Sequence, residues 1–205
     1  MLGWALPRAA RPEGFDAIGH TTLGATTMKN TVRGVAALLG LAVAFSAPLA
    51  RAAETPKVGD MAPDFRLKGS DGKTYSLADF KGKKGVVLAW FPKAFTGGCT
   101  AECKSMKTSG EELKATSVAY FTASVDQPEE NAKFAESLGL DYPILSDPEK
   151  SAAKAYGVLN ARGMADRWTF YIDKNGVIKE VDKKINNPNA GMDIATKVKK
   201  LGIGG

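Results

Sequence analysis

Two apolar segments of strand length, separated by a stretch of helix length, constrain the fold of this chain most. The runs "VVLAW" (Val86–Trp90) and "VAYFTASV" (Val118–Val125) carry no charged residue, which is typical of strands buried on both faces of a sheet. Between them, residues 98–115 predict a helix. Alternating strands and helices favour an α/β sandwich, with helices on both faces of one mixed sheet.

Turn signals predict a hairpin at each end of this sheet. Residues 64–80 alternate apolar and polar side chains about Asp71-Gly72, and Asn175-Gly176 separates two β-rich runs within residues 167–182. Both dipeptides are typical of tight hairpin turns. The remaining predicted elements are helices over 129–138, 149–156 and 193–201 and a short strand over 142–146. Ligands bind beyond the carboxyl ends of such strands, where residues 91–103 lie.

The N-terminal part has the layout of a secretory signal that starts at Met28. Lys29 and Arg33 form a positive region, Gly34–Ala47 is an uncharged and mostly apolar stretch, and small residues precede a cleavage point after Ala52. The apolar stretch is short for a membrane span. We therefore expect a periplasmic or secreted protein with no stable membrane insertion after the signal is cleaved.

This interpretation divides the chain into three parts: an upstream extension (1–27) that is not part of the mature protein, a signal peptide (28–52) and one globular domain (53–205). The formal charge of the whole chain is +6, and residues 1–52 hold five of its basic and two of its acidic residues. The domain is thus left with +3, which does not indicate a nucleic-acid partner.

The only two cysteines lie four residues apart, at the start of the predicted helix 98–115. Cys99 falls in the first turn, where the helix dipole favours an anion, and the thiolate is the reactive form of cysteine. Cys103 follows one turn later, on a stripe that continues through Met106, Gly110 and Leu113, so both thiols are expected to face the protein body. Cys103 is thus either a small buried hydrophobic residue or a second redox-active thiol.

An intact helix does not suit a disulfide between these two residues. Side chains at i and i+4 have Cβ atoms about 5–6 Å apart, whereas a disulfide needs about 3.5–4.5 Å. The bridge would also close a very short loop, so it would constrain the unfolded chain little. The spacing therefore favours a transient redox role over a structural crosslink.

With these residues in view, the chain resembles the peroxiredoxins of the AhpC/TSA superfamily. "FPKAFTGGC" (Phe91–Cys99) matches the pattern P-x-x-x-T-x-x-C, and Arg167–Asp173 matches a second signature, R-x-[TS]-F-x-I-D. The opening "VGDMAPDFRL" (Val58–Leu67) is similar as well. Within the superfamily the chain looks most like the bacterioferritin-comigratory, or Q-type, group. The resemblance implies a thioredoxin-like fold.

The resemblance also implies roles for the residues of these motifs. Cys99 would be the peroxidatic thiolate that attacks the peroxide and becomes a sulfenic acid. Arg167 would favour the thiolate and orient the peroxide. Thr96 would present its hydroxyl to sulfur and substrate or cap the helix, and Pro92 would fix the loop and shield the thiolate. Glu102 would orient Arg167 or a neighbour, with a solvated helix residue as the alternative.

The chain departs from the Q-type pattern at Gly97, where that group has proline, and at its second cysteine. In the Q-type group a spacing of four residues occurs, but the resolving cysteine commonly lies five residues after the peroxidatic one. Here that position is Lys104, so Cys103 is the candidate resolving residue. The expected activity is reduction of hydrogen peroxide and organic hydroperoxides, with a Cys99–Cys103 disulfide that a thioredoxin-like dithiol reduces. If Cys103 cannot reach Cys99, an external thiol would recycle the enzyme. No metal or organic cofactor is expected.

Three other functions share parts of this pattern. A C-x-x-x-C pair on a thioredoxin-like fold also resembles the copper-delivering Sco proteins, which need a histidine as third ligand. The only histidine is His20, upstream of Met28, and Thr100 stands where proline is expected in that group. A thioredoxin-type disulfide oxidoreductase would use C-x-x-C, and a non-enzymatic binding domain would not need the full motif set.

Overall fold

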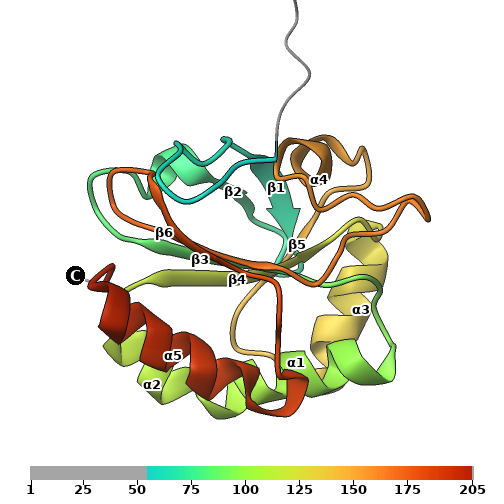
Figure 1. Ribbon diagram of the computed structural model, residues 1–205. Coiled ribbons are helices and arrows are strands. Elements are labelled where there is room, and N and C mark those ends of the chain that lie inside the picture. The colour runs from blue at the N-terminus through green and yellow to red at the C-terminus, as the bar shows by residue number, and fades with distance from the viewer. Residues whose placement is uncertain (1–54, 205) are drawn as a thin grey trace, which may run out of the picture. The chain divides into compact units, whose positions relative to one another are not determined.

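The computed structural model describes residues 55–204 of the 205-residue chain (Figure 1). These residues fall within the predicted globular domain. The predicted upstream extension (1–27) and signal peptide (28–52) lie outside the described residues. In the described part, no helix has the length and apolar character needed to cross a membrane.

A seven-stranded mixed sheet forms the centre of the domain, with the strand order β2-β1-β5-β4-β3-β6-β7. β3 lies between a parallel neighbour, β4, and an antiparallel neighbour, β6. The two predicted hairpins are present as β1–β2 and β6–β7. The strands are β1 (Arg66–Gly69), β2 (Thr74–Ser76), β3 (Val86–Trp90), β4 (Ala119–Ser124), β5 (Ile144–Ser146), β6 (Thr169–Ile172) and β7 (Ile178–Asp182).

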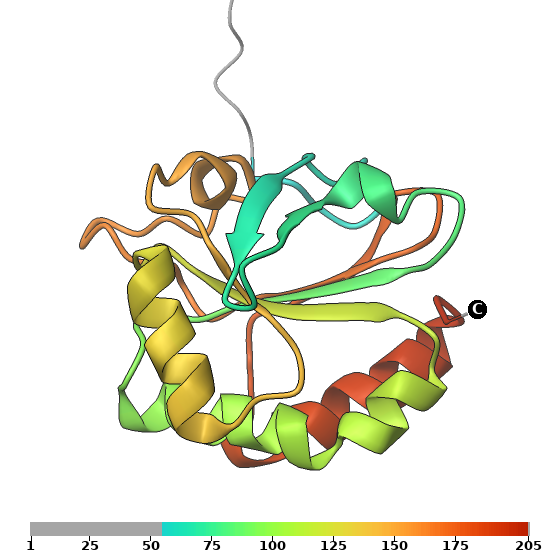
Figure 2. The same ribbon diagram turned by 180° about the vertical axis from the view of Figure 1, so that it is seen from behind.

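Helices cover both faces of the sheet, as predicted. Helices α1, α2, α3 and α5 lie on one side of the central strands, and the short α4 lies on the other (Figures 1 and 2). Two 3₁₀ turns, η1 and η2, were not expected from the sequence. The helical elements are η1 (Leu77–Asp79), α1 (Gly97–Thr108), α2 (Gly110–Ala115), α3 (Pro128–Leu138), α4 (Ser151–Ala155), η2 (Asn187–Asn189) and α5 (Ala190–Leu201).

The five residues of β3 are all buried, because the strand has a core on each face. Val86, Leu88 and Trp90 point into the core that lies beneath the β1–β2 hairpin and α4. Val87 and Ala89 point into the core formed with α1, α2 and α5. Because both faces are buried, the run contains no polar residue. The loop that follows therefore starts from a fully buried strand end.

The single helix predicted over residues 98–115 is instead two helices, α1 and α2, which meet at Ser109. The residues at the junction, Thr108-Ser109-Gly110, all have lower helix propensity than their neighbours. The hydroxyl of Thr108 also donates a 3.0 Å hydrogen bond to the carbonyl of Lys104, a contact that tends to bend helices. The predicted apolar stripe is nevertheless buried along both helices, including Cys99 and Cys103.

Helix α5 begins at Ala190, three residues before the predicted start, because its first turn packs closely against α1. The backbone N–H of Gly191 donates a 3.0 Å hydrogen bond to the Ser105 hydroxyl. A Cβ at Gly191 would lie 2.4 Å from the carbonyl oxygen of Ser105 and 2.8 Å from the Cα of Met106. Backbone contacts this short leave no room for a side chain.

We predict that Gly191→Ala lowers the free energy of unfolding by about 2 kcal/mol, since α5 must move away from α1. Urea unfolding of the reduced protein measures the change. Gly97→Ala is the matched control, because this glycine also begins a helix but has open space around the new Cβ. Equal stability of the two variants would contradict the close packing of α5 on α1.

Candidate active site

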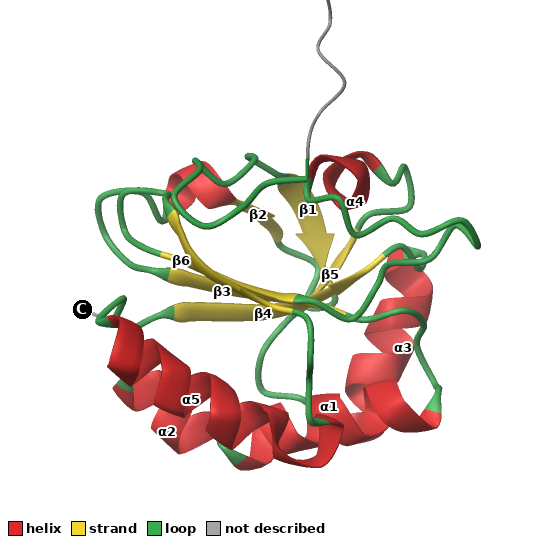
Figure 3. Cartoon of the chain, viewed as in Figure 1, coloured by secondary structure: helices red, strands yellow, loops and turns green. Residues whose placement is uncertain are grey.

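The loop between β3 and α1 leaves the carboxyl end of β3 and leads into the start of α1 (Figure 3). The first cysteine, Cys99, lies in the helical turn that follows. Phe91 is buried and donates a 2.9 Å backbone hydrogen bond to Ala123 of β4. Pro92 is half-buried in the bend that follows. Phe95 has a left-handed backbone (φ 61°) and packs its ring 5.0 Å from that of Phe134 on α3. The loop therefore turns sharply from the sheet into the start of α1.

Cys99 is the third residue of α1, and its side chain is fully buried. The residue before the helix, Thr96, makes no side-chain capping bond. Its exposed hydroxyl donates a 2.9 Å hydrogen bond to the carbonyl of Lys93, rather than to the sulfur of Cys99. The backbone N–H groups of a first helical turn have no partner within the helix, so their partial positive charge lies beside the sulfur.

Arg167 approaches the same sulfur from the strand on the other side of β3. It lies two residues before β6, and the pairing of Ala89 with Thr169 carries it to the carboxyl end of β3. Its Nη2 donates a hydrogen bond to the Cys99 Sγ over 3.1 Å. A guanidinium at this distance stabilises a thiolate over a thiol, since it carries a full positive charge.

Glu102 accepts the other arm of the same guanidinium. Its Oε2 is hydrogen-bonded and ion-paired with Nη1 of Arg167. The carboxyl group is fully buried, and its Oε1 has no hydrogen-bond partner among the described residues. Burial raises the pKa of Glu102 to about 7, against the opposing attraction of Arg167. The side chain is thus not a solvated helix residue; it holds Arg167 in place.

Cys103 lies one turn after Cys99, in an apolar environment. Both are free thiols, and Phe91, Phe134 and Ile144 pack in the same cluster. Burial, reinforced by the negative charge of Glu102, raises the pKa of Cys103 to about 12. Because only the thiolate is strongly nucleophilic, this environment disfavours reaction of Cys103 while α1 stays folded around it.

Two further residues contact this region without having been singled out in the sequence. Asp126, just after β4, accepts a 2.9 Å hydrogen bond from the backbone N–H of Ala94. Asn187 in η2 packs on Gly98: a Cβ there would lie 2.9 Å from Nδ2 of Asn187 and 3.3 Å from Nη2 of Arg167. An acidic residue at the carboxyl end of a buried strand could have marked Asp126, but no local signal distinguishes Asn187.

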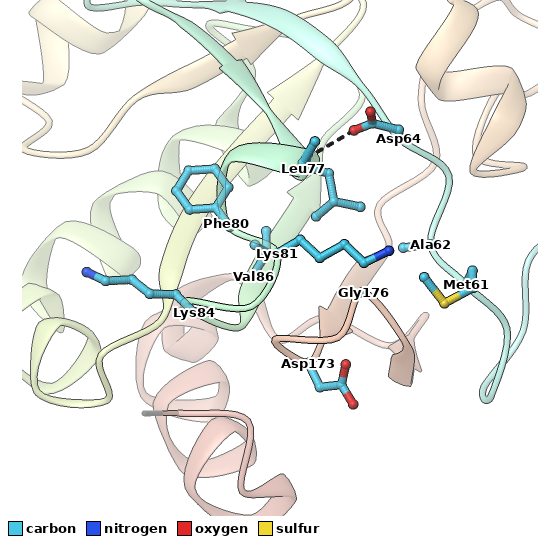
Figure 4. Close-up of a pocket in the computed structure, with 11 residues that line it drawn as sticks. Met61, Ala62, Asp64, Leu77, Phe80, Lys81, Lys84, Val86, Asp173 and Gly176 are labelled. Carbon is cyan, nitrogen blue, oxygen red and sulfur yellow. Dashed lines mark hydrogen bonds between the residues drawn. The ribbon is translucent and has the colours of Figure 1, made fainter.

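A small hollow of about 150 Å³ lies at the opposite end of β3 from Cys99, and Figure 4 shows the residues that line it. Met61, Leu77, Phe80 and Val86 give it apolar walls, and Lys81 lies across it. Ligand sites are usually at least twice as large. Within residues 55–204, no group of three or more His, Cys, Asp or Glu side chains is arranged to hold a metal.

Replacing the buried carboxyl of Glu102 tests whether its pKa is raised in the folded protein. A group whose pKa is raised by folding stabilises the native state while it is protonated. We therefore predict that Glu102 alone lowers the free energy of unfolding by up to about 3 kcal/mol as the pH rises from 4.5 to 7.5. Glu102→Gln, which keeps an acceptor for Arg167, removes this contribution.

Urea unfolding of both reduced proteins in steps across this range gives the comparison. All other titrating groups are shared, so the difference between the two curves isolates Glu102. Curves that run parallel would show that the carboxyl has an ordinary pKa in the folded protein.

Comparison with known proteins agrees with this geometry. The model of the AhpC/TSA family matches residues 58–181. Alkyl hydroperoxide reductase E of Mycobacterium tuberculosis is 35% identical over 130 residues, which are 62% of this chain and 85% of the relative. Peroxiredoxin Bcp of Escherichia coli is 34% identical over 140 residues, or 64% of this chain and 89% of the relative.

Solved structures show the same relationship. Peroxidoxin BcpB from Mycobacterium tuberculosis superposes with a TM-score of 0.63 at 30% identity, covering 70% of this chain and 96% of that protein. The Xanthomonas campestris bacterioferritin comigratory protein, at 20% identity, shares the fold, with a TM-score of 0.64 over 71% of this chain and 98% of its own. The chain therefore belongs to the AhpC/TSA family: it is a peroxiredoxin with a thioredoxin-like fold, and a thiol peroxidase.

Proposed function

We propose that Cys99 is the peroxidatic residue and that Arg167 activates it. The observation that carries this proposal is the 3.1 Å hydrogen bond from the guanidinium to a buried sulfur in the first turn of α1. Both the arginine and the helix end place positive charge beside the sulfur. In the described part of the chain, the only other cysteine is held as a thiol by its surroundings.

The first step is an attack of the Cys99 thiolate on one oxygen of the hydroperoxide. The S–O bond forms as the O–O bond breaks, and the leaving oxygen takes a proton and departs as water or an alcohol. Sulfur is oxidised to the sulfenic acid, and the peroxide is reduced. The remaining donor positions of Arg167 can orient the peroxide, because its side chain is 20% exposed whereas Cys99 is buried. Pro92 keeps its proposed role of fixing the loop and shielding the thiolate. The Thr96 hydroxyl, which is bonded to the carbonyl of Lys93, neither contacts the sulfur nor caps the helix.

Cys103 resolves the sulfenic acid in the second step. Its sulfur attacks that of Cys99, and water leaves as the disulfide forms. The two residues lie on one continuous helix, where side chains at this spacing are too far apart for a disulfide. The first turn of α1 therefore unwinds, and the same movement takes Cys103 out of the apolar cluster that keeps it protonated.

A dithiol of the thioredoxin kind then returns both cysteines to thiols by exchange. The substrates we propose are hydrogen peroxide and organic hydroperoxides. The second class is supported by the name of one relative, alkyl hydroperoxide reductase E. This assignment leaves the Sco-like copper function without support, since the described residues offer no third ligand.

We further propose that residues 28–52 direct the protein out of the cytoplasm. Support comes from the sequence: two positive residues, an apolar stretch and small residues at Ala50 and Ala52. The mature protein would then begin at or near Ala53. Its partner in reduction would be an exported dithiol protein.

Rapid mixing of reduced protein with hydrogen peroxide tests the two cysteine roles. We predict that Cys99→Ser abolishes oxidation, because the attacking sulfur is gone. Cys103→Ser is predicted to keep a fast first phase but to stop at the sulfenic acid and then over-oxidise. Tryptophan fluorescence follows the phases, and mass spectrometry identifies the products. Unchanged turnover of Cys103→Ser with a thioredoxin would refute its resolving role.

The mass of the protein isolated from its native cells tests the targeting proposal. We predict a chain that starts at Ala53 or one residue later. A species that retains residues 2–27 would show that the upstream extension is translated and that the signal is not used.

A further inference from the structure

The buried carboxylate of Asp126 joins the end of β4 to the loop that carries Cys99. Its Oδ2 accepts a 2.9 Å hydrogen bond from the backbone N–H of Ala94, and its Oδ1 accepts a 3.1 Å bond from the ammonium of Lys93. The Asp126 side chain is 6% exposed, whereas that of Lys93 is 49% exposed. The bond to Ala94 is therefore shielded from water, and the bond to Lys93 is not.

Asp126 itself is held by a polar network within the core. Its backbone N–H donates to the hydroxyl of Ser124 over 3.2 Å. The amide of Asn131 on α3 donates to this hydroxyl over 3.0 Å and to that of Ser146 over 2.9 Å. These groups are buried, and satisfied buried networks give a rigid position. The carboxylate is thus a fixed point to which the loop is attached.

Ala94 lies only five residues before Cys99, in a loop without regular secondary structure. The residue after it, Phe95, has a left-handed backbone and a side chain that is 56% exposed. Non-glycine residues in this conformation persist only where the surrounding contacts hold them. The contact of Ala94 with Asp126 is such a contact, so it helps to decide where α1 begins and where the Cys99 sulfur lies relative to Arg167.

The chemistry proposed above makes opposite demands on this attachment. Oxidation of Cys99 needs the folded first turn, because only there does Arg167 contact the sulfur. Disulfide formation needs that turn to unwind. The sulfenic acid also has a competing reaction: a second hydroperoxide can oxidise it to a sulfinic acid, with release of water or an alcohol.

We propose that Asp126 is a positioning residue that holds the start of α1 against unwinding, and that it thereby sets the partition of the Cys99 sulfenic acid between disulfide and sulfinic acid. This inference rests on the proposed function of Cys99 and Cys103. It assigns to Asp126 no contact with substrate. Its effect is transmitted through the backbone of the loop.

The test is a single-turnover experiment on reduced Asp126→Ala with hydrogen peroxide, in which both rates are measured. Loss of a buried charged hydrogen bond is expected to slow the oxidation of Cys99 and to speed disulfide formation, each by roughly tenfold. The fraction of sulfinic acid at a fixed peroxide concentration, measured by mass spectrometry, should fall. A merely damaged structure would slow both rates together, and that result would overturn the proposal.

Two matched variants complete the experiment. Asp126→Asn keeps an oxygen for Ala94 but loses the charge, so both rates should shift in the same directions by a smaller factor. It also serves as the test if the alanine variant does not fold, and unchanged rates would then refute the proposal. Glu130→Gln removes the charge of the second, exposed carboxylate that contacts Lys93 and should leave both rates as they are. A shift equal to that of Asp126→Ala would assign the effect to surface charge.

A separate outcome identifies failure of the underlying function. If the unaltered protein forms no Cys99–Cys103 disulfide after peroxide treatment, the resolving role of Cys103 is wrong. If the disulfide forms in the unaltered protein and Asp126→Ala does not change its rate, the function stands and the role of Asp126 is wrong.

Discussion

The guanidinium of Arg167 lies between two buried acidic groups, the thiol of Cys99 and the carboxyl of Glu102. Each of these groups is fully buried, and an isolated negative charge there would be strongly unfavourable. One cation shared between them lowers that cost for whichever group is ionised. Both acidic residues belong to α1, whereas the cation comes from the chain just before β6, so the interaction depends on how the sheet and the helix meet.

β3 is the strand that brings Arg167 and the cysteine loop together. The strand is buried on both faces, and its antiparallel partner β6 and parallel partner β4 bring residues distant in sequence to the same edge. Arg167 arrives from one side and Asp126 from the other, with the cysteine loop between them. The apolar run therefore does more than fill the core: it aligns the two groups that hold the loop from opposite sides.

The pattern of apolar residues was sufficient to predict the class of fold. All seven strands fall within predicted segments, because burial on one face leaves an alternation of apolar and polar residues and burial on two faces leaves a continuous apolar run. The break between α1 and α2 was not predicted, since it depends on the weak propensities of residues 108–110 and on a hydroxyl contact inside the helix. The early start of α5 depends on contact between helices, which local sequence does not contain.

The site likewise could be predicted where local sequence marks a residue, and not where its role depends on contacts between distant elements. Cys99 could be predicted from its place in the first turn of a helix. Arg167 and Glu102 were predicted from the resemblance to the AhpC/TSA family, to which the chain belongs. The contact of Arg167 with both residues required coordinates, and so did the direction of the Thr96 hydroxyl. No local signal marks Asn187, and the only signal for Asp126 is its place just after a buried strand. Only the topology shows that they border the cysteine loop.

The adjacent glycines before Cys99 are not equivalent in this environment. Open space surrounds Gly97, whereas Gly98 faces the guanidinium and the amide of Asn187 at close range. One wall of the reactive centre is therefore main chain. A side chain at position 97 would meet open space, whereas a side chain at position 98 would have to displace Arg167 or Asn187.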